Sequence, residues 1–267
     1  EPPAAAHRYV KDELRFLAGF LDMIEINSSF YRIPTPHMAE SWASRVVRKP
    51  GFFFTAKLHR DFTHRFSHDA RLADAYKAGL RPLVDRGMLH TVLAQFKYDF
   101  DDTEEHRAVV DWIQRQFCTF APLVVEVRHR SWATAEALGF LQNCNVTLAS
   151  LDYPLADDSF NLYARSLGKT AYLRLHGRNR EAWFSKEASA AETYNYDYSD
   201  AEIASLAERS RTLLDDSKVL TIVANNHFRG KSVSAALRLK AALSGRRVDI
   251  PPALLETYPT LHRIAAS

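Results

Sequence analysis

Residues 123–128 read Leu-Val-Val-Glu-Val-Arg, a short apolar run that ends in two charged side chains. Side chains alternate faces along a strand, so Glu126 and Arg128 share one side while Val125 and Val127 take the other. In a parallel sheet that helices cover, strands normally read as nearly continuous Val, Ile and Leu. The charged side chains at the end of this run therefore indicate either a functional site or a structural ion pair.

Six further runs have the same form, and most of them also end in polar side chains. They are Met23–Asn27, Phe52–His59, Thr91–Phe96, Val146–Asp152, Ala171–His176 and Val219–Asn225. Alternation predicts a common face for each of these sets: Glu25 with Asn27, Lys57 with His59, Ser150 with Asp152, and Arg174 with His176. Polar groups that recur at matching strand ends predict one shared pocket.

Helical patterns separate the strands. Thr35 and Pro36 predict an N-cap followed by proline at the first helical position, and Ser199 with Glu202 predicts a capping box. Gly245 marks the end of the last clear helix. That last helix is expected at residues 231–243, and the other helices at residues 12–21, 70–85, 103–117 and 134–143. Regular strand–helix alternation without a linker or repeat predicts a single parallel α/β domain over residues 1–267.

Two α/β architectures fit this alternation. A doubly wound open sheet normally has a glycine-rich phosphate loop, but the chain has only nine Gly and neither of the usual phosphate-loop motifs. A barrel places its working residues at the carboxyl ends of many strands, as this pattern does. The sequence therefore favours a TIM-type (β/α)8 barrel, although only seven of the eight strands are found.

The composition is that of an ordinary globular protein, with 46% hydrophobic and 25% charged residues. The net charge of +3 is well short of that of a dedicated nucleic-acid binder. Cys118 and Cys144 lie in predicted helices without a paired motif, which predicts reduced, packed thiols. There is no apolar stretch of membrane-spanning length, and residues 1–4 do not resemble a signal peptide. A cytoplasmic protein is expected, and the oligomeric state stays open.

The charges at the strand ends balance. Three are negative and three positive: Glu25, Glu126 and Asp152 against Lys57, Arg128 and Arg174. Such balance fits a structural ion network, which stabilises little because desolvation offsets the attraction. It equally fits a catalytic pocket in which carboxylates act as acid and base beside cations that hold an anion.

Lys57 and the histidines allow more than one chemistry. Burial lowers a lysine pKa, which suits a base or a Schiff-base nucleophile, but an anion-binding point charge is the favoured interpretation of Lys57. Histidines could join the carboxylates as ligands of zinc or manganese: His59, His64, His129, His176 and His227. A metal is not favoured, because no ligand motif is present and three nearby cations would repel a divalent ion.

Two loops add binding candidates. A long segment after His176 contains Arg178 and is rich in aromatic side chains: Trp183, Phe184, Tyr194, Tyr196 and Tyr198. These rings either stack on a ligand or pin the loop to the barrel rim. Asn225 and Asn226 follow the last strand, where backbone N–H groups at a helix start can bind an anion or form an ordinary turn.

Several blocks of the sequence resemble the YecE-like family, domain of unknown function 72. They occur at residues 24–31, 54–57 with 63–64, 126–132, 172–178, 194–199 and 225–227. The resemblance implies a TIM-type barrel with its pocket at the carboxyl ends of the strands, and it implies no established reaction. It also suggests similarity to the endonuclease IV type of barrel, which would point to DNA or phosphodiester binding. The Gly-x-Ser/Ala-Gly-Trp-like loop and first strand of the family are not found here.

We expect an enzyme that acts on an anionic, phosphate-ester-like substrate. Lys57, Arg128 and Arg174 would hold the anion. The expected catalytic residues are Glu126 or Asp152 as general base or acid and His176 as proton shuttle. The remaining substrate-binding candidates are Glu25, Asn27, His59, His64, His129, Arg178, Asn225 and Asn226.

Two alternatives of a different class stay open. One is a non-catalytic nucleic-acid-binding module that uses basic side chains and loop tyrosines for phosphate contact and stacking. The other is a structural barrel whose polar interior is self-satisfied. A small anionic ligand is the expected partner, and the sequence does not identify a cofactor.

Overall fold

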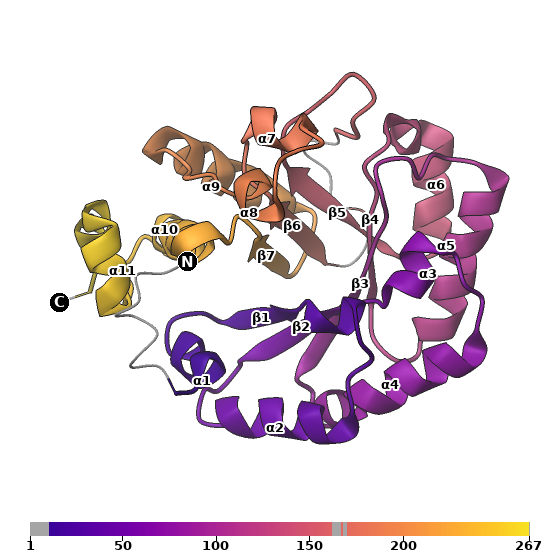
Figure 1. The fold of residues 1–267 in the computed structure, drawn as a ribbon, viewed down its shortest axis with the longest axis horizontal. Helices are drawn as coiled ribbons and strands as arrows, with labels where there is room; N and C mark the ends of the chain where they lie inside the picture. Colours follow the sequence, from indigo (N-terminus) through magenta and orange to yellow (C-terminus); the bar gives the residue numbers. More distant parts are fainter. Residues whose placement is uncertain (1–10, 162–166, 168–169, 267) are drawn as a thin grey trace.

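Seven parallel strands form the centre of the computed structural model, which describes residues 11–161, 167 and 170–266. They are β1 (Met23–Ile26), β2 (Phe53–Lys57), β3 (Leu89–Gln95), β4 (Leu123–Glu126), β5 (Thr147–Asp152), β6 (Ala171–Leu175) and β7 (Leu220–Ala224). Each strand pairs in parallel with the next along the chain. The strands curve into a nearly closed barrel with β1 and β7 at its two edges (Figure 1), which confirms the predicted TIM-type fold.

Helices surround the strands. They are α1 (Glu13–Ala18), α2 (Pro36–Val46), α3 (Arg60–His64), α4 (Ala70–Asp85), α5 (Glu104–Phe117), α6 (Ala135–Asn143), α7 (Arg180–Phe184), α8 (Ala190–Thr193), α9 (Asp200–Asp215), α10 (Lys231–Ser244) and α11 (Pro252–Thr257). Single 3-10 turns span Ser28–Phe30, Arg130–Ala133, Phe228–Gly230 and Pro259–Arg263. The predicted caps are confirmed: Thr35 accepts a hydrogen bond from Met38 N, and Ser199 and Glu202 form a capping box.

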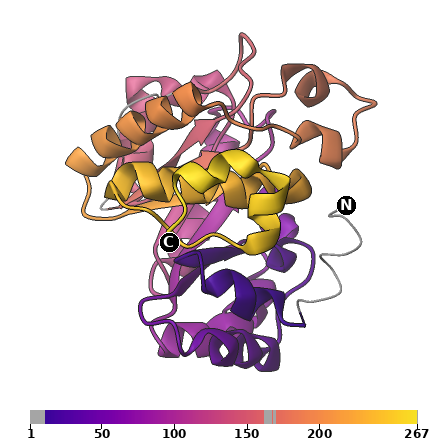
Figure 2. The same ribbon diagram turned by 90° about the vertical axis from the view of Figure 1, so that its left-hand side faces the viewer.

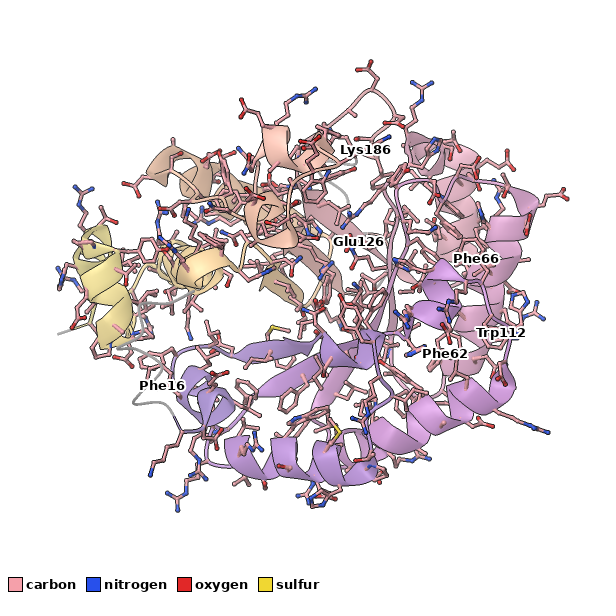
Figure 3. The ribbon with its side chains drawn as sticks, viewed as in Figure 1. Phe16, Phe62, Phe66, Trp112, Glu126 and Lys186 are labelled. Carbon is pink, nitrogen blue, oxygen red and sulfur yellow. The ribbon has the colours of Figure 1, made fainter. Side chains whose placement is uncertain are left out.

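The outer face of the barrel packs against the helices. Val125 and Val127 belong to a large apolar cluster that includes side chains from α5 and α6, such as Ile113 and Leu141. Figure 3 shows Phe62 and Trp112, which extend this layer, between the sheet and the molecular surface. Burying one such side chain contributes about 1.5–3 kcal/mol, so this layer holds the helices on the sheet.

Strand register decides which side chains face the barrel interior. Paired residues of parallel strands share a face, and the pairing matches Glu25 with Thr55, and Lys57 with Leu93. It also matches Gln95 with Glu126, and Leu151 with Arg174. Below these polar groups, the inner face is apolar: Leu93, Val124, Ala149, Leu151, Tyr172 and Val223 form one cluster. The polar groups therefore lie at the carboxyl ends of the strands, and the apolar cluster fills the barrel interior below them.

The last helices connect the two edges of the barrel. Lys240 of α10 donates to Asp22 Oδ1 at 2.8 Å and to the carbonyl of Phe20 at 3.2 Å, just before β1. Phe20 also packs against an apolar cluster formed by α10 and α11, which includes Leu237 and Leu254. Figure 2 shows α10 and α11 between α1 and α9. The edges thus meet through side chains of the outer layer.

Two smaller expectations concern the thiols and the membrane. Cys118 and Cys144 are free and follow α5 and α6 directly. Cys144 is partly buried but Cys118 is exposed, so the expectation of a packed thiol is wrong for Cys118. Among the described residues, no helix has both the length and the apolar character needed to cross a bilayer.

Candidate functional site

Arg174 is the centre of an ion network that crosses the barrel. Its Nη2 donates to Glu25 Oε1 at 2.6 Å and its Nη1 to Glu126 Oε2 at 2.5 Å. The three side chains are 1%, 3% and 0% exposed, and they come from β6, β1 and β4. Buried charges are tolerated only when they are paired in this way. The structure therefore brings together three of the predicted site residues.

Glu126 uses both of its carboxylate oxygens. Arg128 donates to Oε1 from Nε at 3.1 Å and from Nη2 at 2.8 Å, while Arg174 occupies Oε2. Burial acts to raise the pKa of Glu126, but the charges of Arg174 and Arg128 outweigh it and hold that pKa well below its usual range. Glu126 is therefore a permanent anion that anchors the two arginines, and it has no proton to donate near neutral pH.

Tyr172 completes the network and was not predicted from the sequence as a site residue. Its hydroxyl donates to Glu25 Oε2 at 2.9 Å and lies 3.2 Å from Thr55 Oγ1. Burial, followed by the charge of Glu25, raises the pKa of Tyr172 well above its ordinary value. Two sequence signals could have found it: its position two residues before Arg174, on the same strand face, and its place in the family-like block at residues 172–178.

Lys57 differs from Arg128 and Arg174 because its charge has no carboxylate partner among the described residues. Its Nζ lies 3.9 Å from the centroid of the Phe30 ring and makes no hydrogen bond or ion pair with another described residue. Burial and then the charge of Arg174 lower the pKa of Lys57 from 10.5 to about 8, although Glu126 and Glu25 act in the opposite direction. Three cations thus face two carboxylates.

His176 is fully buried beside Glu126. Its Nδ1 lies 3.2 Å from Nδ2 of Asn225, and an amide that donates to Nδ1 leaves the ring proton on Nε2. That atom is 3.3 Å from Glu126 Oε1, without the alignment of a hydrogen bond. Burial lowers the pKa of His176 to about 4, so the ring is neutral at pH 7. This geometry makes His176 a fixed wall of the site and a poor proton shuttle.

Aromatic rings surround His176 on the loop side. The ring of Trp183, from α7, lies 5.8 Å from His176 and 5.9 Å from Tyr194. The guanidinium of Arg128 lies 5.3 Å from the Trp183 ring, within cation–π range. Trp183 and Tyr194 are only partly buried, so they leave ring surface beside the charged cluster.

Asp152 and Arg178 form a separate cluster, which corrects the prediction that they share the common pocket. Arg178 donates from Nη2 to Asp152 Oδ1 at 2.7 Å, and Tyr198 donates to Oδ2 at 2.8 Å. Asp152 faces outward because its neighbour Leu151 pairs with the inward-facing Arg174. Arg178 also donates to Glu202 Oε1 of α9 at 2.9 Å. This cluster fastens the loop that carries Trp183 to the outside of the barrel.

Two tyrosines of the long loop pin it to the barrel rim, which is one of the two roles expected from the sequence. Tyr196 and Tyr198 fasten the loop: Tyr196 donates to Glu202 Oε1 at 2.7 Å, and Tyr198 accepts from Gly177 N at 3.0 Å. Asn226 is fully buried and donates to the carbonyl of Tyr196 at 2.9 Å. Asn226 therefore lies in this fastening and not in the ion network.

Two predicted histidines start short helices. His59 Nδ1 accepts from Asp61 N at 3.3 Å, and His129 Nδ1 accepts from Ser131 N at 3.4 Å. Both are N-caps, a local role that their position after a strand did not reveal. His64 lies closer to the network: burial, followed by the charge of Lys57, lowers the pKa of His64 to about 4.

Two predictions about the site remain: the role of Asn27 in binding and the grouping of metal ligands. Asn27 is exposed just after β1, at the start of the 3-10 turn, and gives that turn no side-chain cap. In the described part of the chain, no three or more His, Cys, Asp or Glu side chains are grouped as metal ligands. In the ion network, the carboxylates are instead paired with arginines.

The fold and the cluster define a parallel (β/α) barrel with a buried ion network at the carboxyl ends of its strands. Residues 3–258 match the family model described as "Protein of unknown function DUF72". The chain belongs to this family, as the sequence resemblance indicated. A search of the curated proteins finds no match.

Solved structures of the same family are similar in fold. A DUF72 family protein from Thermotoga maritima matches with a TM-score of 0.77 and 25% identity, over 90% of this chain and 93% of that one. A DUF72 family protein from Enterococcus faecalis matches with a TM-score of 0.79 and 23% identity, over 90% of both chains. These similarities support the barrel and leave the reaction open.

Proposed function

We propose that the protein is an enzyme that binds a small, phosphate-ester-like anion between Lys57 and Arg128. The observation that carries this proposal is the charge of Lys57, which has no counter-ion among the described residues and lies next to a network that is otherwise paired. A partly buried cation is costly, and a bound anion would remove that cost. Arg128 adds a second cation, because its Nη1 makes no hydrogen bond to another described residue.

In this proposal Lys57 replaces the carboxylates as the group that moves protons. Glu126 stays ionised and His176 stays neutral near pH 7, so neither changes its protonation state readily. With a pKa of about 8, Lys57 is populated in both forms near neutral pH, as an acid or base catalyst should be. Glu25 and Arg174 hold the site together and are positioning residues.

Calorimetric titration with inorganic phosphate tests the binding step. We expect Lys57→Met or Arg128→Met to weaken phosphate binding by roughly 10- to 100-fold, the value of one charged hydrogen bond of about 1.5–3 kcal/mol. Arg130→Met is the matched control, because Arg130 is exposed on the same loop and its side chain makes only a 3.4 Å hydrogen bond, to Asp157 O, among the described residues. Equal binding by all three variants, or no binding by the wild type, would contradict the proposal.

A structural role is the second candidate, and the closed triad of Glu25, Arg174 and Glu126 favours it. It predicts that substitutions in the network lower stability and that phosphate does not bind. The nucleic-acid alternative has less support, because loop cations are already paired: Arg65 with Asp61 at 3.0 Å and Lys97 with Asp99 at 3.7 Å.

A further inference from the structure

We infer that Lys57 is an amine nucleophile that forms an imine with the carbonyl group of an anionic aldehyde or ketone. This inference rests on the proposed anion site and names the substrate class that the site would take. The amine comes from the inner face of β2, at its carboxyl end, where the substrates of barrel enzymes bind. The anionic group would lie against Arg128. Lys57 holds the anion in its protonated form, and as the neutral amine it would face the carbonyl carbon.

The surroundings of Lys57 leave its amine available. The charged groups that act on it most are Glu25 of β1, Glu126 of β4, Arg128 just after β4 and Arg174 of β6. His64 of α3 also lies within electrostatic reach of Lys57. Both carboxylates accept hydrogen bonds from arginine, and neither makes an ion pair with the ammonium of Lys57. The amine nitrogen Nζ lies 3.9 Å from the centroid of the Phe30 ring, which offers no lone pair. An amine beside other cations and poorly solvated is the environment that activates lysine nucleophiles.

The protonation state supports this chemistry. The pKa of Lys57, lowered from 10.5 to about 8 by burial and by Arg174, leaves a substantial neutral population near pH 7.5. About a quarter of such amines are neutral at that pH, against about one in a thousand for an ordinary lysine. Only the neutral form has the lone pair that attacks a carbonyl carbon.

The step is balanced without a redox partner. The lone pair of Lys57 Nζ forms a bond to the carbonyl carbon, and the π electrons move to the carbonyl oxygen. A proton passes from nitrogen to that oxygen through solvent, which gives a carbinolamine. The hydroxyl then takes up a proton from solvent and leaves as water, while the nitrogen lone pair forms the second C–N bond and gives a protonated imine. A protonated imine carries the same charge as the lysine ammonium, so the pairing of Arg174 with Glu25 and Glu126 is left unchanged.

Borohydride trapping tests the inference. Pyridoxal 5′-phosphate supplies an aldehyde and a phosphate in one probe, and pyridoxal is the matched probe without the phosphate. After reduction, peptide mapping by mass spectrometry reports the labelled lysine. Lys97 and Lys186, both exposed, are internal controls. We expect Lys57 to be labelled at least about tenfold faster than either control at pH 7.5, and faster by the phosphate form than by pyridoxal.

The outcomes separate this inference from the proposed function. Lys57→Arg should abolish the selective adduct while Lys97→Arg keeps it. If wild-type protein binds inorganic phosphate but Lys57 is labelled no faster than Lys97, the imine is excluded and the anion site stands. If neither phosphate binding nor selective labelling is found, both proposals fail. Labelling of the wild type alone decides the question even if the Lys57 variant does not fold.

Discussion

Replacing Lys57 by methionine should make the protein more stable, which is the opposite of the usual effect of a substitution inside a barrel. Lys57 carries a partly buried charge without a counter-ion among the described residues. Methionine keeps most of the apolar stem and removes the charge. A functional residue kept at a cost in stability is typical of active sites.

The magnitude follows from the pKa. Its lowering from 10.5 to about 8 corresponds to about 3 kcal/mol between the two protonation states. Two effects reduce this value. The Lys57 side chain keeps some contact with solvent, which screens its charge, and the substitution removes the cation–π contact with Phe30. We therefore expect Lys57→Met to raise the free energy of unfolding by about 1–2 kcal/mol at pH 7.

The direction of the pKa shift of Lys57 also predicts how stability depends on pH. The pKa of Lys57 is lower in the folded protein than in the unfolded chain, so the unfolded chain binds more protons between pH 8 and pH 10.5. Stability of the wild type should therefore rise across this window relative to Lys57→Met. Below pH 8 the advantage of the variant should be complete, and above pH 10.5 it should vanish.

Urea unfolding at pH 7, 9 and 10 measures this difference. Lys97→Met is the matched control, since Lys97 is exposed and, in the described part of the chain, pairs only with exposed Asp99. We expect it to change stability by less than about 0.5 kcal/mol. A variant at Lys57 that is less stable than the wild type at pH 7, or a difference that does not change with pH, would refute the argument.

Two further substitutions test the network and the loop, both by urea unfolding. Arg174→Met leaves Glu25 and Glu126 without their shared partner and should cost about 3–5 kcal/mol; a loss below about 1 kcal/mol would mean that the triad is not formed. Gly177→Ala should lower the free energy of unfolding more than Gly87→Ala does. At Gly87 an added Cβ meets only the strain of the left-handed backbone, about 1–2 kcal/mol. At Gly177, where φ is +84°, a Cβ would also lie 2.6 Å from Tyr196 Cβ, so equal losses would contradict the close packing of this loop.

The local features of the fold could be read from the sequence. Thr35 and Ser199 begin helices where predicted, because capping depends on residues only three positions apart. The seven apolar runs became the seven strands for a similar reason, since apolar residues bounded by turns specify strands locally. Alternation within one strand also paired Glu126 correctly with Arg128.

Tertiary structure alone decided how one strand faces another. The sequence showed that Ser150 and Asp152 share a face, but only the pairing of Leu151 with Arg174 turns that face outward, toward Arg209 and Arg178. The physical reason is that alternation has a period of two, so a register difference of one residue exchanges inside for outside.

The sequence by itself thus determined a parallel α/β barrel and most of the charges at the ends of its strands. The partners of those charges depend on residues about 50 to 150 positions apart, as when Arg174 meets both Glu126 and Glu25. Pairing at such distances depends on closure of the barrel, which no local pattern encodes. The same arrangement pairs Arg174 and Arg128 with the two carboxylates and leaves Lys57 without a carboxylate partner among the described residues.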